Sequence, residues 1–171
     1  VGAALAAGCC VIIKPSELAS FTCLYLGQLA TEAGVPPGAL NVVTGTGTAA
    51  GAPLAAAEDV DMLTFTGSTA TGSSVMKARA QRALPVQVEL GGKSPHIVFH
   101  DADLDRAIPA LAFGAFFAQG QNCNAGSRLL VDQAIAEDVT ARLVAYSSKI
   151  KIGPTQDPTT ELGAIVSQRQ L

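Results

Sequence analysis

The sequence predicts an α/β fold, with a parallel, doubly wound (Rossmann-like) sheet followed by the start of a second α/β domain. Short continuous apolar runs, such as residues 9–13 (CCVII), are typical of buried parallel strands. They alternate with segments long enough to form helices, which is the pattern of a parallel sheet with right-handed crossovers. With 49% hydrophobic and 15% charged residues, the chain can also bury a sizeable core.

Four strands are expected in the first part of the chain. The first strand ends at Lys14-Pro15, and the helix that follows stops at Gly34 and the two prolines after it. Ser68 and Thr69 carry hydroxyl groups, which favour the beginning of a helix at residues 67–69. In order, the expected segments are strand 9–13, helix 18–33, strand 40–43, turn 44–47, helix 49–57, strand 62–65, a helix from 67–69 to about 80, and strand 85–90.

Gly91-Gly92 marks the expected change of domain, so residues 1–91 are assigned to one domain and residues 92–171 to the first part of another. Residues 101–103 (DAD) supply an N-cap for a strongly apolar helix. The segments expected after the glycines are strand 96–99, helix 104–117, loop 120–126, strand 128–131, amphipathic helix 135–149 and loop 153–160.

Charge and hydropathy argue against two kinds of partner. A net charge of -3 provides no basic surface for nucleic acid or for an anionic membrane. The longest apolar run, residues 1–13, is shorter than the roughly 18 residues that a membrane span needs. It also lacks the positive first region of a signal peptide. We therefore expect neither nucleic acid nor a membrane as a partner.

The cysteines and histidines predict no metal site. Of the 4 cysteines, two are adjacent and none forms a CxxC pair, and 2 histidines are too few for a cluster of ligands. Reduced thiols in a cytoplasmic protein are the simplest interpretation.

A thiol and a carboxylate stand out, at Cys123 and Glu89. Cys123 lies in a polar loop flanked by glycines, whereas the other cysteines fit the small buried hydrophobe that a cysteine usually is. Glu89 ends an apolar strand, which favours burial and hence a role as a base, although a surface salt bridge is the ordinary alternative. These two groups can form and then hydrolyse a thioester. Residue chemistry alone leaves each interpretation open.

A cysteine–histidine pair, as in a thiol hydrolase, is the rival arrangement. Two histidines, His96 and His100, flank the strand expected at 96–99. His96 alternates with the apolar face of this strand, and no third residue that would orient either imidazole is apparent. The pair is therefore disfavoured.

Two segments carry a resemblance to a known family. Residues 88–95 (VELGGKSP) and 119–128 (QGQNCNAGSR), in this order and separation, resemble the NAD(P)-dependent aldehyde dehydrogenase superfamily. The resemblance runs through nearly the whole chain. It implies oxidation of an aldehyde to a carboxylic acid, in which Cys123 attacks the aldehyde carbon and passes through a thiohemiacetal and a thioester. Glu89 would activate the water that releases the acid, and the second domain would be the catalytic one.

The cofactor residues are assigned by the same resemblance. Gly67 and Ser68 begin a helix, where an ordinary N-cap is the common interpretation and an anion site the functional one. Residues 44–47 (TGTG) are not a GxGxxG fingerprint, because the third glycine comes one residue late. The resemblance nevertheless implies a dinucleotide-binding domain, whose expected cofactor residues are Lys14, Ser16, Glu17, Gly47, Phe65, Gly67, Ser68 and Gly91.

NAD is expected in preference to NADP because of Glu17. In relatives, the lysine and glutamate of the KPSE segment contact the adenine ribose, and here they are Lys14 and Glu17. A carboxylate at this place would repel a 2′-phosphate.

Some parts of the family pattern are absent. Ala118 stands where many members have asparagine, and the segments carrying the oxyanion-hole asparagine and a second glutamate match nothing here. We therefore expect an internal piece of a longer chain, poorly active alone, whose parent forms a homodimer or homotetramer. Two alternatives are a coenzyme A-acylating relative, which generally lacks the counterpart of Glu89, and a non-catalytic NAD-binding or structural relative.

Overall fold

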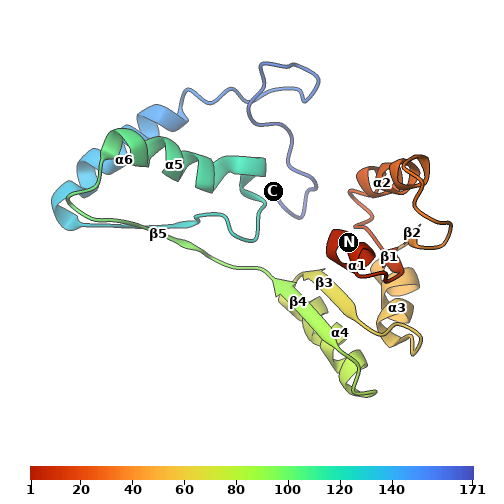
Figure 1. The fold of residues 1–171 in the computed structure, drawn as a ribbon. Coiled ribbons are helices and arrows are strands. Elements are labelled where there is room, and N and C mark those ends of the chain that lie inside the picture. The colour runs from red at the N-terminus through yellow and green to blue at the C-terminus, as the bar shows by residue number, and fades with distance from the viewer. The chain divides into compact units, whose positions relative to one another are not determined.

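The computed structural model describes all 171 residues and divides them into two compact units, Val1–Glu89 and Leu90–Leu171 (Figure 1). The sequence places the change of domain at Gly91-Gly92. The assignment of one domain to dinucleotide binding and the other to catalysis stays a prediction. Neither unit contains a helix with the length and hydropathy that crossing a membrane requires.

The first unit alternates strands with helices, and each of the four expected strand segments contains a strand. This confirms the α/β class. Two elements were not predicted: a short helix at the start of the chain and a π-helix in the glycine-rich turn. The elements are α1 (Gly2–Ala6), β1 (Val11–Ile13), α2 (Phe21–Glu32), β2 (Leu40–Val42), η1 (Gly47–Gly51), α3 (Ala52–Ala56), β3 (Leu63–Gly67), α4 (Thr69–Ala80) and β4 (Val86–Leu90).

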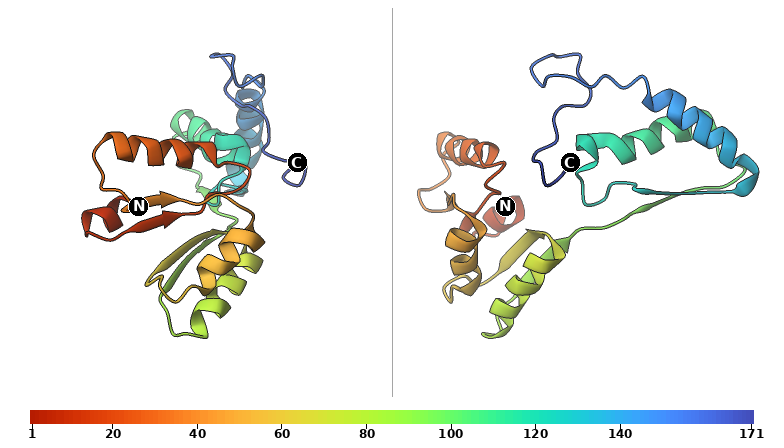
Figure 2. Two further views of the ribbon diagram at one scale, coloured as in Figure 1. Left: turned by 90° about the vertical axis from the view of Figure 1, so that its right-hand side faces the viewer. Right: turned by 180° about the vertical axis from the view of Figure 1, so that it is seen from behind.

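The strands of the first unit pair two by two. β1 runs parallel to β2, with Val11 opposite Leu40, and β3 lies beside β4. Helix α2 packs on β2 and helix α4 on β3 (Figure 2). Half-buried residues alternate with exposed ones along these strands, and Ile12 remains 48% exposed. The expectation of a fully buried strand at residues 9–13 is therefore wrong, because only one face of the strand is covered.

A buried arginine holds the second half of this unit together. Arg79, in the last turn of α4, is completely buried. Its guanidinium donates hydrogen bonds to four carbonyl oxygens: those of Ala57 (3.2 Å), Val60 (2.6 Å), Asp61 (3.2 Å) and Pro85 (3.3 Å). One side chain thus joins α4 to the connection before β3 and to the residue that precedes β4. The fork of donors on a guanidinium suits this task.

The second unit is built on another pair of parallel strands. β5 (Pro95–Val98) pairs with β6 (Arg128–Val131), with Pro95 opposite Arg128 and Val98 opposite Val131. Helices α5 (Leu104–Phe116) and α6 (Ala136–Ser147) pack against each other (Figure 2). A tight turn with left-handed residues, η2 (Phe117–Gly120), follows α5, and a short 3-10 helix, η3 (Gln133–Ile135), follows β6.

Apolar residues from β5, α5 and α6 form the core of this unit. The core comprises Val98, Ile108, Leu111 and Val139. Helix α5 begins where the sequence predicts, because the Asp103 carboxylate accepts hydrogen bonds from the amides of Asp105 and Arg106. The cap fixes the direction in which α5 leaves β5 and so brings its apolar face onto the sheet.

The imidazole of His96 fills a space that two glycines leave open. A Cβ placed on Gly114 of α5 would lie 2.6 Å from Cε1 of His96, and a Cβ on Gly126 would overlap the same ring. The amide of Gly126 also donates to the carbonyl of Gly114 at 2.9 Å. Strand β5, helix α5 and the segment before β6 therefore meet at this ring.

We expect Arg79→Lys to lower the free energy of unfolding by about 3 kcal/mol, because the compact ammonium group cannot reproduce the bonds of the planar guanidinium fork to carbonyls on separate segments. The shift of the urea midpoint at an unchanged slope measures this loss in the full-length protein. Arg82→Lys is the control, because the Arg82 side chain is 42% exposed and pairs at the surface with Glu58. We expect a loss below about 0.5 kcal/mol for the control. Equal losses in the two variants would contradict the role given to Arg79.

We expect Gly126→Ala to destabilise the protein by about 2 kcal/mol, because the new Cβ overlaps the His96 ring. His96→Ala removes the ring, so the double variant should be more stable than the sum of the two single losses predicts, by about 1 kcal/mol or more. Urea unfolding of the four members of this cycle provides the measurement. Strictly additive losses would show that His96 does not fill this space.

Candidate functional site

The loop after β1 and the turn after β2 meet at one edge of their sheet. Because β1 and β2 are parallel, their carboxyl ends share that edge. The Lys14 side chain joins the two loops at this edge. Its Nζ donates to the carbonyl of Gly45 at 2.9 Å and to that of Pro15 at 2.6 Å. The same nitrogen lies 3.7 Å from the Glu17 carboxylate. Lys14, Ser16, Glu17 and Gly47, which the sequence assigns to one site, therefore belong to adjoining loops.

The carboxylate of Glu17 is held in its charged form. Its pKa is lowered, first by a hydrogen bond from its own backbone amide, and further by the amide of Gly47 and by the ammonium of Lys14. Glu17 and its neighbour Ser16 are exposed. An exposed carboxylate with fixed partners is suited to accept hydrogen bonds from hydroxyl groups.

The glycine-rich turn is a cap followed by a π-helix rather than a dinucleotide fingerprint. Thr46 Oγ1 accepts a hydrogen bond from the amide of Ala49 at 3.1 Å, and the next residue begins η1. Gly45 has φ 151°, and a Cβ there would lie 2.9 Å from Cβ of Ala50, so this position requires glycine. No atom lies within 4 Å of where a Cβ on Gly47 would be, so a ligand can approach the backbone there.

The start of α4 presents open amide groups. Ser68 is the N-cap: its Oγ accepts from the amide of Thr71 at 3.2 Å and donates to the Thr71 hydroxyl at 2.9 Å. The Phe65 ring folds over Gly67, where a Cβ would lie 2.5 Å from Cζ of the ring. Gly67 and Ser68 are exposed. Free amides and the helix dipole at the end of this 12-residue helix favour an anion.

Glu89 lies on the outer face of β4. Val86 and Val88 are half-buried, whereas Gln87 and Glu89 are exposed and joined by a hydrogen bond of 3.2 Å from Nε2 to Oε1. The expected burial of Glu89 is therefore wrong, because the alternation of the strand that buries the valines turns the carboxylate outward. Gly91, the first glycine after the strand, is exposed and has open space beside it.

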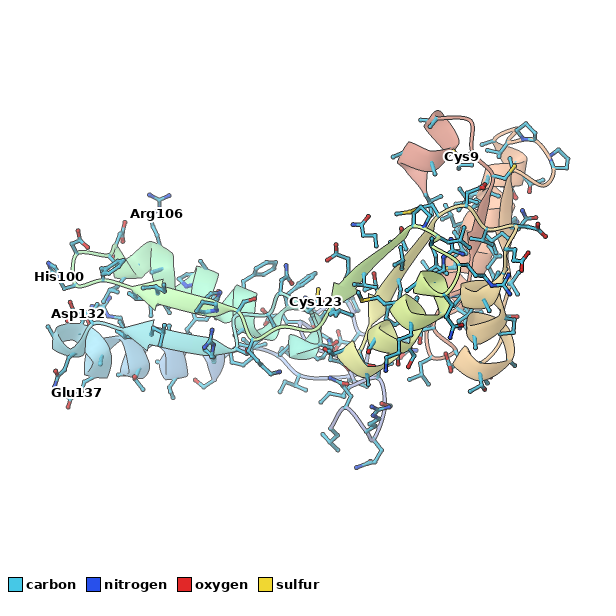
Figure 3. All side chains as sticks on the ribbon, turned by 90° about the horizontal axis from the view of Figure 1, so that it is seen from below. Cys9, His100, Arg106, Cys123, Asp132 and Glu137 are labelled. Atoms are coloured by element: carbon cyan, nitrogen blue, oxygen red, sulfur yellow. The ribbon has the colours of Figure 1, made fainter.

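Cys123 lies at the exposed tip of a loop whose two ends are tied down. The thiol is exposed (Figure 3), whereas Ala125 and Gly126 are buried and Gln121 is half-buried. The amide of Gly126 is bonded to α5, and that of Ala125 donates to the carbonyl of Asn122 at 3.2 Å. The backbone hydrogen bonds of the loop use amides on both sides of Cys123 and leave its own N–H free.

The chain enters this loop through three successive residues in the left-handed region. These are Ala118 (φ 50°), Gln119 (φ 58°) and Gly120 (φ 70°). Each residue other than glycine costs about 1–3 kcal/mol there, and alanine tolerates this region less well than asparagine does. A Cβ on Gly120 would also lie 3.1 Å from the carbonyl of Ala115. The sequence identifies Gly120 as a residue suited to this region, but it does not predict the strained backbone of Ala118 and Gln119.

Neither histidine completes a cysteine–histidine pair. His100 has an orienting partner, since its Nδ1 lies 3.2 Å from the Asp132 carboxylate, but both residues lie at the far end of the second unit from Cys123 (Figure 3). The ring of His96 is packed against Gly114 and Gly126. No group of three or more histidine, cysteine, aspartate or glutamate side chains is arranged to hold a metal ion.

Comparison with known proteins identifies the family. A family model described as "Aldehyde dehydrogenase family" matches residues 1–171. A chloroplastic betaine aldehyde dehydrogenase from Beta vulgaris is 52% identical over 170 residues, which are 99% of this chain and 34% of the relative. A peroxisomal aminoaldehyde dehydrogenase 2 from Pisum sativum gives the same identity and coverage. The chain thus spans about a third of the length of the curated relatives it matches.

Solved structures agree with this comparison. Betaine aldehyde dehydrogenase from Staphylococcus aureus in complex with NAD+ matches with a TM-score of 0.92 and 38% identity, covering 97% of this chain and 33% of that one. An NAD-dependent aldehyde dehydrogenase from Sinorhizobium meliloti matches with a TM-score of 0.92 and 45% identity, covering 95% and 32% of the two chains.

The prediction of a cytoplasmic location is wrong by this comparison. Relatives that are 52% identical to the chain are named chloroplastic or peroxisomal. The prediction depends on reduced thiols alone. Thiols stay reduced in any compartment whose redox potential is reducing, so they do not identify the cytoplasm.

The family model covers every residue, relatives of this identity cover nearly the whole chain, and the solved structures share its fold, so the chain belongs to the aldehyde dehydrogenase family.

Proposed function

We propose that the protein containing this chain oxidises an aldehyde to the carboxylic acid with NAD, using Cys123 as the nucleophile. The observation that carries the proposal is the placement of Cys123, an exposed thiol on a loop whose ends are tied down. The relatives act on betaine aldehyde or aminoaldehydes by name, so aldehydes of these two kinds are the first substrates to test. We infer a homodimer or homotetramer as its assembly.

The residues at the edge of the first unit fit NAD. The open start of α4 at Gly67 and Ser68 suits the pyrophosphate, and the free space at Gly47 admits a ligand to the backbone. Lys14, Ser16 and Glu17 offer polar groups to ribose hydroxyls. Phe65 and Gly91 complete the proposed set: the Phe65 ring lies beside Gly67, which stays exposed, and Gly91 has open space beside it at the end of β4. When bound, NAD accepts the hydride and becomes NADH.

The reaction needs one group that attacks and one that accepts a proton. The Cys123 thiolate adds to the carbonyl carbon, which gives a thiohemiacetal whose oxyanion the free Cys123 amide can stabilise. Departure of the hydride leaves a thioester on Cys123. Glu89 takes a proton from water, the hydroxide attacks the thioester carbon, and the C–S bond breaks to release the acid and the thiolate. The sum is aldehyde, NAD+ and water to acid, NADH and a proton.

Two other functions predict different products. In a coenzyme A-acylating relative, a thiol would replace water in the last step and yield acyl-CoA. Glu89 favours water, because relatives that use coenzyme A generally lack this glutamate. A non-catalytic relative would give no product, and the presence of both Cys123 and Glu89 argues against it. An assay of the full-length protein for acid, for acyl-CoA and for neither product separates the three functions.

We expect the full-length protein to prefer NAD to NADP by about tenfold or more in kcat/KM, because the Glu17 carboxylate repels a 2′-phosphate. Glu17→Gln should narrow this ratio. Glu32→Gln is the control, since it removes the same charge from exposed Glu32 at the end of α2. A preference for NADP, or an equal change in both variants, would show that Glu17 does not set the choice of cofactor.

We expect Glu89→Gln to stop the reaction after one turnover. Attack by an ionised thiol and transfer of hydride need no base, whereas an amide cannot accept the proton of the deacylating water. Rapid mixing should show a burst of NADH near about one equivalent per site and then a slow phase, and mass spectrometry should find the acyl group on Cys123.

Two further variants control this experiment. Cys123→Ala should abolish oxidation while leaving NAD binding intact. Cys9→Ala should retain full activity; it removes another exposed thiol, since the expectation that Cys9 is buried is wrong. Aldehyde oxidation by Cys123→Ala would refute the assignment of the nucleophile. If Glu89→Gln shows no burst, Glu89 also deprotonates the thiol, and the assignment of a deacylation role alone is wrong.

A further inference from the structure

The entry to the Cys123 loop is held in place by residues far along the chain. Gln121, two positions before the cysteine, uses both ends of its side-chain amide. Nε2 donates to the carbonyl of Ala118 at 3.2 Å, and Oε1 accepts from the backbone amide of Val166 at 3.0 Å. The partners in the second bond are 45 residues apart in sequence. One side chain therefore connects the first of the left-handed residues to a segment outside the loop.

A second glutamine strengthens this connection. With its amide oriented so that both atoms find partners, Gln119 donates to the carbonyl of Ala118 at 3.1 Å and accepts from the amide of Gly163 at 3.0 Å. Gln119 and Gln121 are both half-buried, whereas Cys123 is exposed. The two side chains thus bind the backbone of residues 163–166 from one side.

The segment that receives these bonds is itself anchored. Leu162, which precedes it, forms a parallel bridge with Ile152. The amide of Gly153 donates to the carbonyl of Leu162 at 3.1 Å, and the amide of Leu162 donates to that of Lys151 at 3.1 Å. Residues 163–166 therefore follow directly on an anchored residue, Leu162.

We propose that Gln121 is a positioning residue for the nucleophile: by binding the Val166 amide, it holds the strained entry of the loop and so fixes where the Cys123 thiol stands. The argument rests on the proposed function, because only then does the position of the thiol matter for a reaction. Backbone conformations in sparsely populated regions persist only where the surrounding structure holds them. The amide of Gly126 secures the exit of the loop on α5, and Gln121 secures its entry.

The first test measures the loop directly, in the full-length protein. Gln121→Leu removes the acceptor, and Val166→Pro removes the donor at the other end of the same bond without touching the loop. We expect amide hydrogen exchange over residues 118–127 to become about tenfold faster or more in each variant. The double variant should exchange no faster than the faster single variant, because both changes break one bond. Additive effects, or an unchanged exchange rate in Gln121→Leu, would overturn the proposal.

The second test measures the reaction. The rate constant of NADH formation in a single turnover should fall by between about tenfold and a hundredfold in Gln121→Leu and Val166→Pro, because a small displacement of a reacting atom has effects of this size. The dissociation constant of NAD should stay within about twofold, which damage to the whole structure would not allow. Gln121→Glu keeps the acceptor for Val166 but loses the donor to the Ala118 carbonyl, so its loop should exchange more slowly than that of Gln121→Leu. Gln168→Leu, a change at an exposed glutamine of the same region, should behave as wild type.

The outcomes separate the two proposals. If the wild-type protein forms no NADH from any aldehyde, the proposed function fails, and the exchange rates still show whether Gln121 ties the loop. If exchange accelerates while the single-turnover rate is unchanged, the bond exists but does not position the nucleophile, and the inference is wrong. If Gln121→Leu does not fold, Val166→Pro and Gln121→Glu decide the question with the same two measurements.

Discussion

Parallel pairing of strands decides where the candidate residues lie within each unit. In the first unit, β1 and β2 end at the same edge, so the residues after them meet, and the bond from Lys14 Nζ to the carbonyl of Gly45 joins the two loops. In the second unit, Cys123 precedes β6 and Gly92 precedes β5, and a Cβ on Gly92 would lie 3.1 Å from the Cys123 carbonyl. The candidate cofactor loops thus occupy a carboxyl edge, and the nucleophile occupies an amino edge.

Both units use hydrogen bonds from or to side-chain polar groups and the backbone where apolar packing is thin. Few apolar side chains are buried in the first unit, and there the buried Arg79 guanidinium donates hydrogen bonds to four carbonyls. In the second unit the core lies between β5, α5 and α6, away from the cysteine loop, which depends instead on the amides of Gln121 and Gly126. At the buried Arg79 these contacts specify geometry, because an unpaired buried polar group is costly in any other arrangement.

Local patterns in the sequence predict the order of strands and helices, but not which faces are covered. The apolar run before Glu89 favours burial of the carboxylate, but Val86 and Val88 alternate with Gln87 and Glu89, and the strand turns the carboxylate outward. A last-turn arginine on a helix usually indicates a favourable interaction with the dipole, so nothing in the sequence predicts that Arg79 is buried. The sequence also does not predict the π-helix at Gly47–Gly51, because its small residues are compatible with an ordinary helix.

Residues near Cys123 and contacts from distant parts of the chain play different parts in the loop that carries the thiol. The residues near the cysteine identify the family, and they include the glycine that the left-handed backbone requires. They do not determine the position of the thiol by themselves. Two of the groups that hold the loop, the carbonyl of Gly114 and the amide of Val166, are backbone atoms whose roles leave no trace in residue identity. A chain that keeps the QGQNCNAGSR segment but changes the backbone at residues 163–166 would therefore keep the motif while losing the geometry on which attack by the thiol depends.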